Sequence, residues 1–221
     1  IVHRLVGSEM CIRDSGLSAG RTSPNAVGIT ATDCDGVAIQ SATNTIDLGD
    51  NAIIIENCDY SDVGSVLTGD SLSSTVGILA DDTNSDLTLN GTEVSGYATG
   101  VSKENGVLFM IGDAEIAGTD YGVYAEDTYV YALVAHVDGG ATGTGLHVVD
   151  SPDAWVYPMD ASGAIGMYVE NTPFRWDGGV SDATTALSVV DATGTVENLT
   201  WSASTTQMNA GNNAHITSIG N

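Results

Sequence analysis

The chain has 221 residues and a formal net charge of −24, from 29 acidic and 5 basic side chains. Nucleic acids and anionic membranes repel such a chain, because phosphate binding requires clustered Lys and Arg. Hydrophobic residues still make up 42% of the sequence, which permits a packed core, and no run of 18 apolar residues predicts a membrane span.

Residues 1–15 differ in character from the rest of the chain. Leu5 to Ser15 reads LVGSEMCIRDS, which resembles a translated sequencing-library adapter, and Arg4 and Arg13 are two of only five basic residues. We therefore expect a non-native segment here, the alternative being a genuine N-terminal arm. Residues 16–221 are expected to form one domain, a piece of a longer protein, since neither end shows an obvious solenoid cap.

From residue 28 onwards, a six-residue motif occurs eight times. It reads Gly or Ala, an apolar residue, any residue, usually a small or apolar residue, any residue, and then Asp or Asn. The copies begin 20 to 25 residues apart, at Gly28, Ala52, Gly77, Gly100, Gly122, Gly145, Gly166 and Ala186. A repeat of this length indicates a stacked architecture in which each copy is one structural unit.

The second and fourth positions of the motif share one face of a strand, because side chains alternate along a strand. The second position is apolar in every copy, and the fourth is apolar in all but one, where Lys103 is expected at a bulge or in a buried ion pair. One or two further strand-like runs follow in each unit, and helical periodicity is nowhere sustained. We therefore predict an all-β fold, a parallel β-helix of about eight to nine coils with 20 to 25 residues each.

The copies Gly-Val-Tyr-Ala-Glu-Asp-Thr at 122–128 and Gly-Met-Tyr-Val-Glu-Asn-Thr at 166–172 carry a family resemblance. They resemble repeats of the right-handed parallel β-helix, or pectin-lyase-like, superfamily, and most closely its carbohydrate-binding and sugar-hydrolase repeats. The resemblance covers about 28 to 207 and implies a single-stranded, right-handed solenoid. It implies less about function, because that superfamily holds lyases, hydrolases, esterases, adhesins and phage spikes.

The sixth position of the motif is always Asp or Asn. These residues tolerate the left-handed backbone region and bond neighbouring backbone groups. We interpret them as a sharp turn repeated in every coil, with side chains that bond up the stack. This turn column comprises Asp33, Asn57, Asp82, Asn105, Asp127, Asp150, Asn171 and Asp191.

Cys34 and Cys58 follow the turn in adjacent coils. Their predicted spacing lies within disulfide range. Both a disulfide and two stacked thiols are compatible with the sequence.

The fifth position of the motif faces outward and carries acids in several successive coils. One interpretation is a solvated acidic face, because neighbouring charges at the strand spacing repel by only roughly 0.9 kcal/mol in a water-like dielectric. The other is a Ca²⁺ ladder, since carboxylate oxygens are the ligands that Ca²⁺ selects. The candidate metal ligands are Glu56, Asp81, Glu104 and Glu126.

Rings occupy the outward third position in three successive coils. Tyr124, His147 and Tyr168 lie there beside Glu126 and Glu170, and Tyr129, Tyr131, Trp155, Phe174 and Trp176 crowd the following segment. Rings stack on sugar faces, and acids form hydrogen bonds with sugar hydroxyls. The sequence therefore predicts a candidate glycan-binding strip of Tyr124, His147, Tyr168, Glu126, Glu170 and Trp176. The alternative is cross-strand aromatic packing, which stabilises a sheet by itself.

Catalysis has less support in the sequence. The family resemblance implies lyases that use acidic Ca²⁺ ligands with an Arg or Lys base. Arg175, Trp176 and Asp177 form the one place where a base, a ring and an acid are adjacent. Arg175 and Asp177 are therefore weak catalytic candidates.

Two functions follow as expectations. The first is a non-catalytic extracellular or cell-surface module that binds glycans or cations, or serves adhesion and structural display. Its predicted location rests on composition, which is poor in Lys and rich in Gly, Thr, Asp and Asn. The alternative is a polysaccharide lyase or glycoside hydrolase. A cleft with converging acids and Arg175 would favour the enzyme, and a flat acidic face would favour the module.

Overall fold

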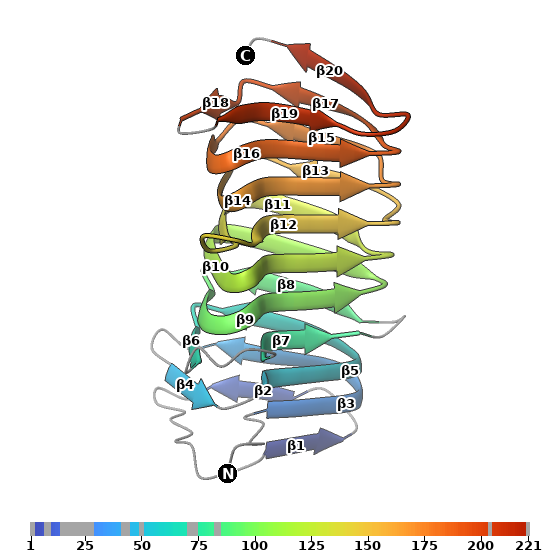
Figure 1. Ribbon diagram of the computed structural model, residues 1–221. Coiled ribbons are helices and arrows are strands. Elements are labelled where there is room, and N and C mark those ends of the chain that lie inside the picture. Colours follow the sequence, from blue (N-terminus) through green and yellow to red (C-terminus); the bar gives the residue numbers. More distant parts are fainter. Residues whose placement is uncertain are drawn as a thin grey trace.

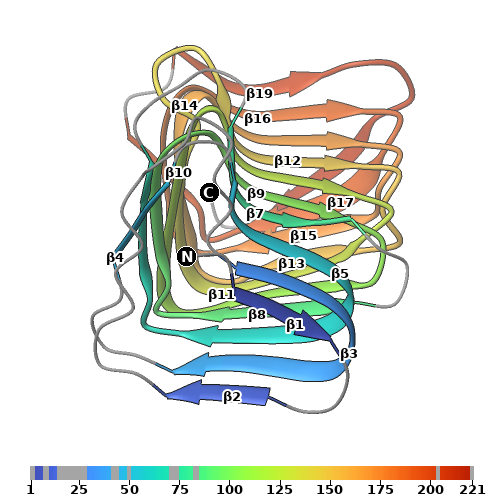
Figure 2. The ribbon, with the colours of Figure 1, turned by 90° about the horizontal axis from the view of Figure 1, so that it is seen from below.

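The computed structural model describes residues 3–6, 10–13, 29–40, 45–48, 51–69, 75–81, 85–202 and 205–219. The secondary structure of this described part is all β, with no helix, and its strands wind into a parallel solenoid of about eight turns (Figure 1). It therefore contains no helix long and apolar enough to cross a membrane. Seen with the blue strands nearest the viewer, the chain runs clockwise as it recedes, so the coil is right-handed (Figure 2). The predicted fold class is confirmed.

Three sheets run along the solenoid, and several long strands bend from one sheet into the next. The motif copies form the first sheet. It contains β1 (His3–Val6), β7 (Val76–Ala80), β12 (Thr144–Val149), β19 (Thr206–Ala210) and parts of β3 (Ile29–Gln40), β5 (Asn51–Val63), β9 (Glu93–Glu104), β10 (Val107–Glu126), β14 (Met159–Glu170) and β16 (Val180–Val190).

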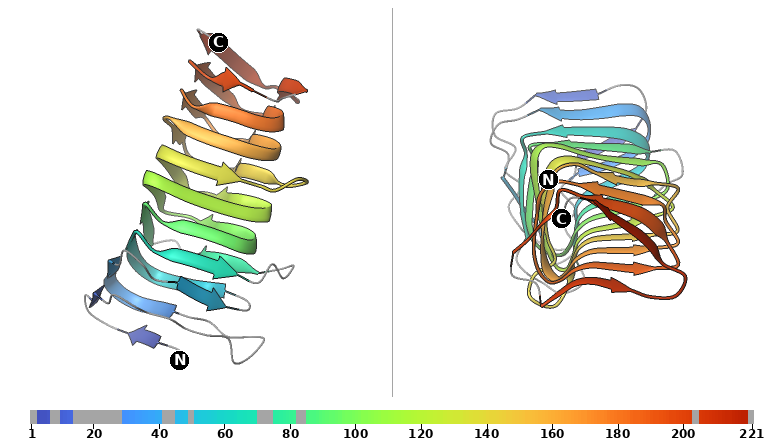
Figure 3. Two further views of the ribbon diagram at one scale, coloured as in Figure 1. Left: turned by 90° about the vertical axis from the view of Figure 1, so that its left-hand side faces the viewer. Right: turned by 90° about the horizontal axis from the view of Figure 1, so that it is seen from above.

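The second and third sheets complete each coil, and the coils stack one above another (Figure 3). The second sheet contains β2 (Met10–Arg13), β8 (Asp86–Asn90), β13 (Ala154–Val156), β15 (Phe174–Asp177), β17 (Thr193–Glu197), β20 (His215–Ile219) and parts of β3, β5, β10 and β11 (Tyr129–Asp138). The third sheet contains β4 (Thr45–Leu48), β6 (Val66–Gly69), β18 (Thr200–Trp201) and parts of β9, β10, β11, β14 and β16.

The adapter-like segment contributes strands β1 and β2, whose backbones pair in parallel with β3. This pairing does not bear on where residues 1–15 came from. Their non-native origin therefore stays a prediction.

Equivalent motif residues are register partners in neighbouring coils, which stacks each sequence position into a column. The second-position column is completely buried in all eight copies, as predicted: Ile29, Ile53, Ile78, Val101, Val123, Leu146, Met167 and Leu187. The fourth-position column is equally buried: Ala31, Ile55, Ala80, Lys103, Ala125, Val148, Val169 and Val189. These two columns form the wall of the core beneath the first sheet.

Lys103 is accommodated without a bulge, because it stays in register with Ala80 and Ala125. Its ammonium donates hydrogen bonds to Ser85 Oγ at 3.1 Å and to the Glu104 carbonyl at 3.0 Å, and also to the Asn105 carbonyl. A buried ammonium costs much free energy unless its protons are bonded. Carbonyls at the turn accept two of those hydrogen bonds. The expected bulge was therefore wrong, and the alternative of a buried ion pair stays a prediction.

The turn column has the left-handed backbone that the sequence predicts. Seven of its members are described, with φ between 49° and 61°, and Asp82 lies outside the described residues. The turns are also joined from coil to coil by the amide of an Asn, which donates to the Asp below it. Asn57 donates to Asp33, Asn171 to Asp150 and Asn213 to Asp191, each at 2.9 Å. We call this arrangement the Asp–Asn ladder.

Cys34 and Cys58 are register partners on β3 and β5. Cys58 is buried and disulfide-bonded. The side chain of Cys34 lies outside the described atoms, so its identity as the partner stays a prediction.

A second corner, between the second and third sheets, uses other residues for the same backbone. Gly91, Asp113, Gly178 and Asn198 have positive φ there, and so does Val134, with φ of 59°. A β-branched side chain rarely adopts this conformation. Val134 is exposed, so no packing contact in the core requires its isopropyl group.

Replacing Val134 by Asn is therefore expected to stabilise the solenoid. Asn tolerates the left-handed region, and relief of this strain is worth about 1 kcal/mol. Thermal unfolding should show a higher midpoint for Val134→Asn. Val63 is an equally exposed valine at a strand end without positive φ; Val63→Asn is the control and should give no gain. Equal midpoints for Val134→Asn and the parent would contradict the strain.

The Asp–Asn ladder predicts a graded response at Asn171. Asn171→Ala loses both the bond to Asp150 and the tolerance of positive φ, and we expect a loss of about 1–2 kcal/mol. Asn171→Gly loses only the bond, so its midpoint of thermal unfolding should lie between those of the parent and Asn171→Ala. If the midpoint of the Gly variant lay at or below that of the Ala variant, the strain of Ala in the left-handed backbone would not contribute to the loss of stability.

Candidate functional site

The outer surface of the first sheet carries a stack of rings. Tyr124, His147 and Tyr168 are register partners, as the sequence predicted. The His147 ring lies 5.3 Å from that of Tyr124 and 4.5 Å from that of Tyr168, with interplanar angles of 19° and 14°. Tyr121 meets Tyr124 and His147 edge-on. We call these four residues the tyrosine–histidine ladder.

The hydroxyls of Tyr124 and Tyr168 are already engaged in hydrogen bonds. The Tyr124 hydroxyl donates to Glu126 at 2.6 Å, and the Tyr168 hydroxyl donates to Glu170 at 2.7 Å. Burial, followed by the Glu170 hydrogen bond and charge, raises the pKa of Tyr168 to about 12. Rings that cover one another present edges to solvent, so a sugar cannot stack on the faces that they share. This geometry is that of cross-strand packing, and glycan binding by these residues stays a prediction.

His147 is held in its neutral form by its position in the stack. Its Nδ1 atom is buried and has no hydrogen-bond partner. Burial lowers the pKa of His147, and the charges of Glu170 and Glu126 oppose that shift without overcoming it. The imidazole therefore behaves as a flat packing group near neutral pH.

The predicted metal ligands lie along the same sheet but do not gather around one point. Glu56, Asp81 and Glu104 are exposed, and Glu126 is half-buried. Burial, and then the charges of Glu126, Asp81 and Asp127, raise the pKa of Glu104. The described residues include no group of three or more His, Cys, Asp or Glu side chains arranged to hold a metal. The Ca²⁺ ladder stays a prediction.

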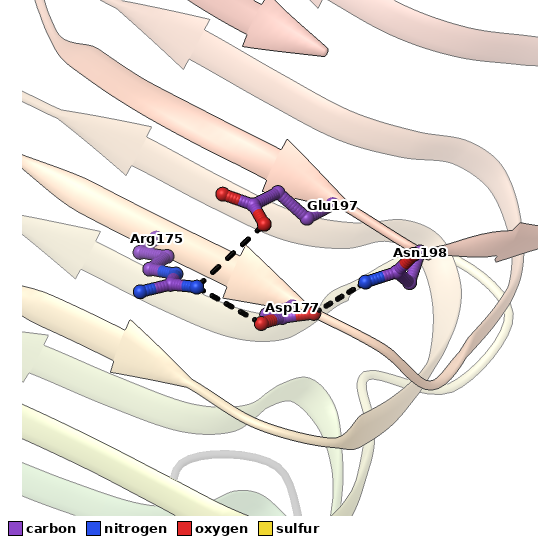
Figure 4. Close-up of polar contacts among 4 residues, drawn as sticks. All are labelled: Arg175, Asp177, Glu197 and Asn198. Carbon is purple, nitrogen blue, oxygen red and sulfur yellow. Dashed lines mark hydrogen bonds and ion pairs between the residues drawn. The ribbon is translucent and has the colours of Figure 1, made fainter. Parts of the chain in front are cut away.

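Trp176 is not part of any surface strip, because its side chain is completely buried. It lies between Arg175 and Asp177 on β15, and alternation along the strand directs it inward while its neighbours face outward. Arg175 Nη2 lies 3.0 Å from Asp177 Oδ2 and 3.6 Å from Glu197 Oε2 (Figure 4). The two catalytic candidates are thus paired with each other, which leaves the guanidinium poorly placed to act as a base.

The outer surface of the second sheet carries a second set of rings, which includes Tyr129, Tyr131 and Trp155 of the crowded aromatic segment, whereas Phe174 and Trp176 of that segment are buried. Phe109, Tyr131 and Trp155 are register partners, and Arg175 continues their column. Phe109 and Tyr131 stack at 5.1 Å and 15°, whereas Tyr131 meets Trp155 edge-on at 6.4 Å and 75°. Tyr131 and Trp155 therefore do not stack face to face.

Tyr129 and Tyr157 flank this column and are more exposed still. Their exposed fractions are 44% and 50%, against 42% for Trp155. We call Phe109, Tyr129, Tyr131, Trp155 and Tyr157 the aromatic face. Contiguous exposed apolar surface is uncommon on soluble proteins and marks interaction sites. The available sequence signal was the spacing of two residues between Tyr129 and Tyr131 and between Trp155 and Tyr157.

The third sheet bears a groove of about 590 Å³, lined by apolar residues and serines together with several acids and one imidazole. Its titratable lining residues include Glu93, Glu115, His136, Asp160 and Asp182. His136 Nδ1 lies 3.3 Å from Asp160 Oδ2, and both side chains are nearly half exposed. Arg175 lies on the second sheet and does not line this groove, so the cleft does not have the composition that would favour a family-type enzyme.

Comparison of the chain with protein-family models, with curated proteins and with solved structures found no match. The structure supports a parallel β-helix on its own evidence. Membership of the pectin-lyase-like superfamily stays a prediction from the resemblance of the repeat.

The position of His147 predicts a pH dependence of stability. Because its folded-state pKa is lowered from 6.5, the unfolded chain takes up the proton first as the pH falls through about 6.5. Stability contributed by neutral His147 is present above that pH and is lost as the pH falls toward the folded-state pKa.

His147→Phe keeps a flat ring in the stack and removes the titration. The drop in unfolding midpoint between pH 8 and pH 5.5 should therefore be smaller in His147→Phe than in the parent. The other titratable groups are present in both proteins, so their contributions to the pH dependence of stability cancel in the comparison. An equal drop in the two proteins would contradict the lowered pKa.

Proposed function

We propose that this solenoid is a non-catalytic, glycan-binding module of an extracellular or cell-surface protein, and that the aromatic face is its binding site. The observation that carries the proposal is the exposure of Tyr129, Trp155 and Tyr157 on one surface of the second sheet. Such rings offer large apolar contact areas at low entropic cost, together with polar groups at their edges.

The chemistry of the aromatic face fits a sugar polymer. One face of a pyranose ring presents C–H groups, which pack against aromatic rings by dispersion, while its hydroxyls need polar partners at the edges. The tyrosine hydroxyls, the indole N–H of Trp155 and the neighbouring Arg175 supply such partners. Successive coils repeat the rings along the solenoid axis, which matches a ligand that is itself a chain of repeating units.

Charge disfavours the other occupants of an apolar surface. A chain with a net charge of −24 repels nucleic acid, anionic membranes and a second copy of itself. An uncharged, amphipathic polymer meets no such barrier. The resemblance of the motif to carbohydrate-binding β-helix repeats, and a composition poor in Lys, agree with this role and location.

A polysaccharide lyase or glycoside hydrolase is the alternative proposal, and the third-sheet groove is the observation that favours it. His136 and Asp160 lie within ion-pair distance inside this groove, beside Glu115. Glycoside hydrolysis uses two carboxyl groups, and several acids line the groove, Glu115 and Asp160 among them. The binding proposal is preferred because it uses the aromatic face, which the groove does not explain.

Two double variants separate the aromatic face from the tyrosine–histidine ladder. Trp155→Ala with Tyr157→Ala removes exposed rings, so binding to immobilised polysaccharides should weaken at least tenfold, a loss of about 1.4 kcal/mol or more. Tyr124→Ala with Tyr168→Ala alters the first sheet and should leave affinity within about twofold. Affinity electrophoresis against a polysaccharide panel measures both, with thermal unfolding as the check on folding.

Equal binding by the parent and the Trp155/Tyr157 variant would sink the proposed site. Loss of binding only in the Tyr124/Tyr168 variant would move the site to the first sheet. Release of new reducing ends or unsaturated products from a bound polymer would instead favour the enzyme.

A further inference from the structure

We infer that the aromatic face selects uncharged glycans over anionic ones, and that Asp177 and Glu197 set this selectivity by occupying Arg175. The inference rests on the proposed function and deepens it by naming the class of ligand. A site for anionic sugars such as uronates would instead need an available cation.

Among the cationic side chains that the structure describes, Arg175 is the one beside the exposed rings. It faces outward as the register partner of Trp155 in the next coil, and its side chain is 47% exposed. Among the Lys and Arg side chains that the structure describes, the other is Lys103, which is buried beneath the first sheet. An anionic sugar on the aromatic face would therefore depend on Arg175 for charge pairing.

The guanidinium is already neutralised by two carboxylates. Both described contacts use Nη2, with Asp177 in the same strand at 3.0 Å and Glu197 in the next coil at 3.6 Å. The two acids are less exposed than the arginine, at 16% and 25%. One positive charge thus faces two negative charges, which leaves this end of the aromatic face with a net charge of −1.

The pair is also fixed in place by the second corner. Asn198, a left-handed residue, donates from Nδ2 to Asp177 Oδ1 at 3.0 Å (Figure 4). Asp177 therefore uses one oxygen for Asn198 and the other for Arg175. A carboxylate held from both sides is not readily displaced by a competing carboxylate from a ligand.

The same arrangement suits an uncharged hydroxyl. The other terminal nitrogen of Arg175 points away from both acids (Figure 4). Guanidinium groups have five donor hydrogens, so this side keeps donors for a neutral acceptor. A sugar hydroxyl accepts such a bond without bringing charge next to Asp177 and Glu197, whereas a uronate is repelled by both.

The test uses polymers matched in backbone and different in charge. Hydroxyethyl cellulose is compared with carboxymethyl cellulose, and fully methyl-esterified polygalacturonate with polygalacturonate, by affinity electrophoresis at fixed ionic strength. The parent should bind the neutral member of a pair at least tenfold more tightly. In Asp177→Asn with Glu197→Gln, the affinities for the two polymers of a pair should differ by no more than about threefold, because the anionic polymer binds more tightly.

A charge-matched control separates this local effect from the field of the whole chain. Glu93→Gln with Glu115→Gln also removes two negative charges, but on the third sheet, and should leave the preference unchanged. Arg175→Gln should weaken binding of the neutral polymer and restore no affinity for the anionic one.

The outcomes distinguish this inference from the proposed function. Equal or tighter binding of anionic polymers by the parent overturns the inference and leaves glycan binding standing. If the Glu93/Glu115 control reduced the preference for the neutral polymer as much as the Asp177/Glu197 variant does, the selectivity would come from overall charge. That result overturns the role of Asp177 and Glu197. Binding to none of the four polymers overturns both proposals.

Discussion

The structure depends on one constraint, which is that every coil turns at the same residue with the same left-handed backbone. Asp and Asn meet this requirement because their side chains tolerate positive φ, and in alternation they also bond each other up the stack. Because the turn recurs at one place, neighbouring strands keep their register. Register then places Leu146 on Val123 and Met167 on Leu146, and the core follows from that stacking.

In-register stacking also converts a sequence position into a surface column, so each sheet acquires its own chemistry. The first sheet stacks Tyr124, His147 and Tyr168 into a self-contained packing unit whose hydroxyls are tied to acids. The second sheet exposes rings, and the third lines a groove with acids and His136. Lys103 is tolerated in the core because the turn carbonyls beside it accept hydrogen bonds from its ammonium.

The sequence predicts the parts of this fold that lie within the motif. There, the alternation of side chains and the Asx turn together determine which residues face the core and which face solvent. The buried columns and the turn column follow directly from these two features. Trp176 was misplaced because it lies beyond the turn that ends the motif, in a second-sheet strand whose inward and outward positions the motif does not define. The contacts of Arg175 with Glu197 and of His136 with Asp160 join different coils. They depend on the second- and third-sheet register, which the motif does not define.

The residues that repeat most faithfully are therefore the least informative about function. The fold itself does not require rings on the second sheet, because register partners of the aromatic column are Thr88 below Phe109 and Thr195 above Arg175. Threonine fills the same outward position in the same strand geometry with no exposed ring. Leaving Tyr129, Trp155 and Tyr157 in contact with water forgoes the free energy of burying them. The fold does not require the exposed rings of the aromatic face and does not bury them, so a ligand that covers them is the best explanation for their presence.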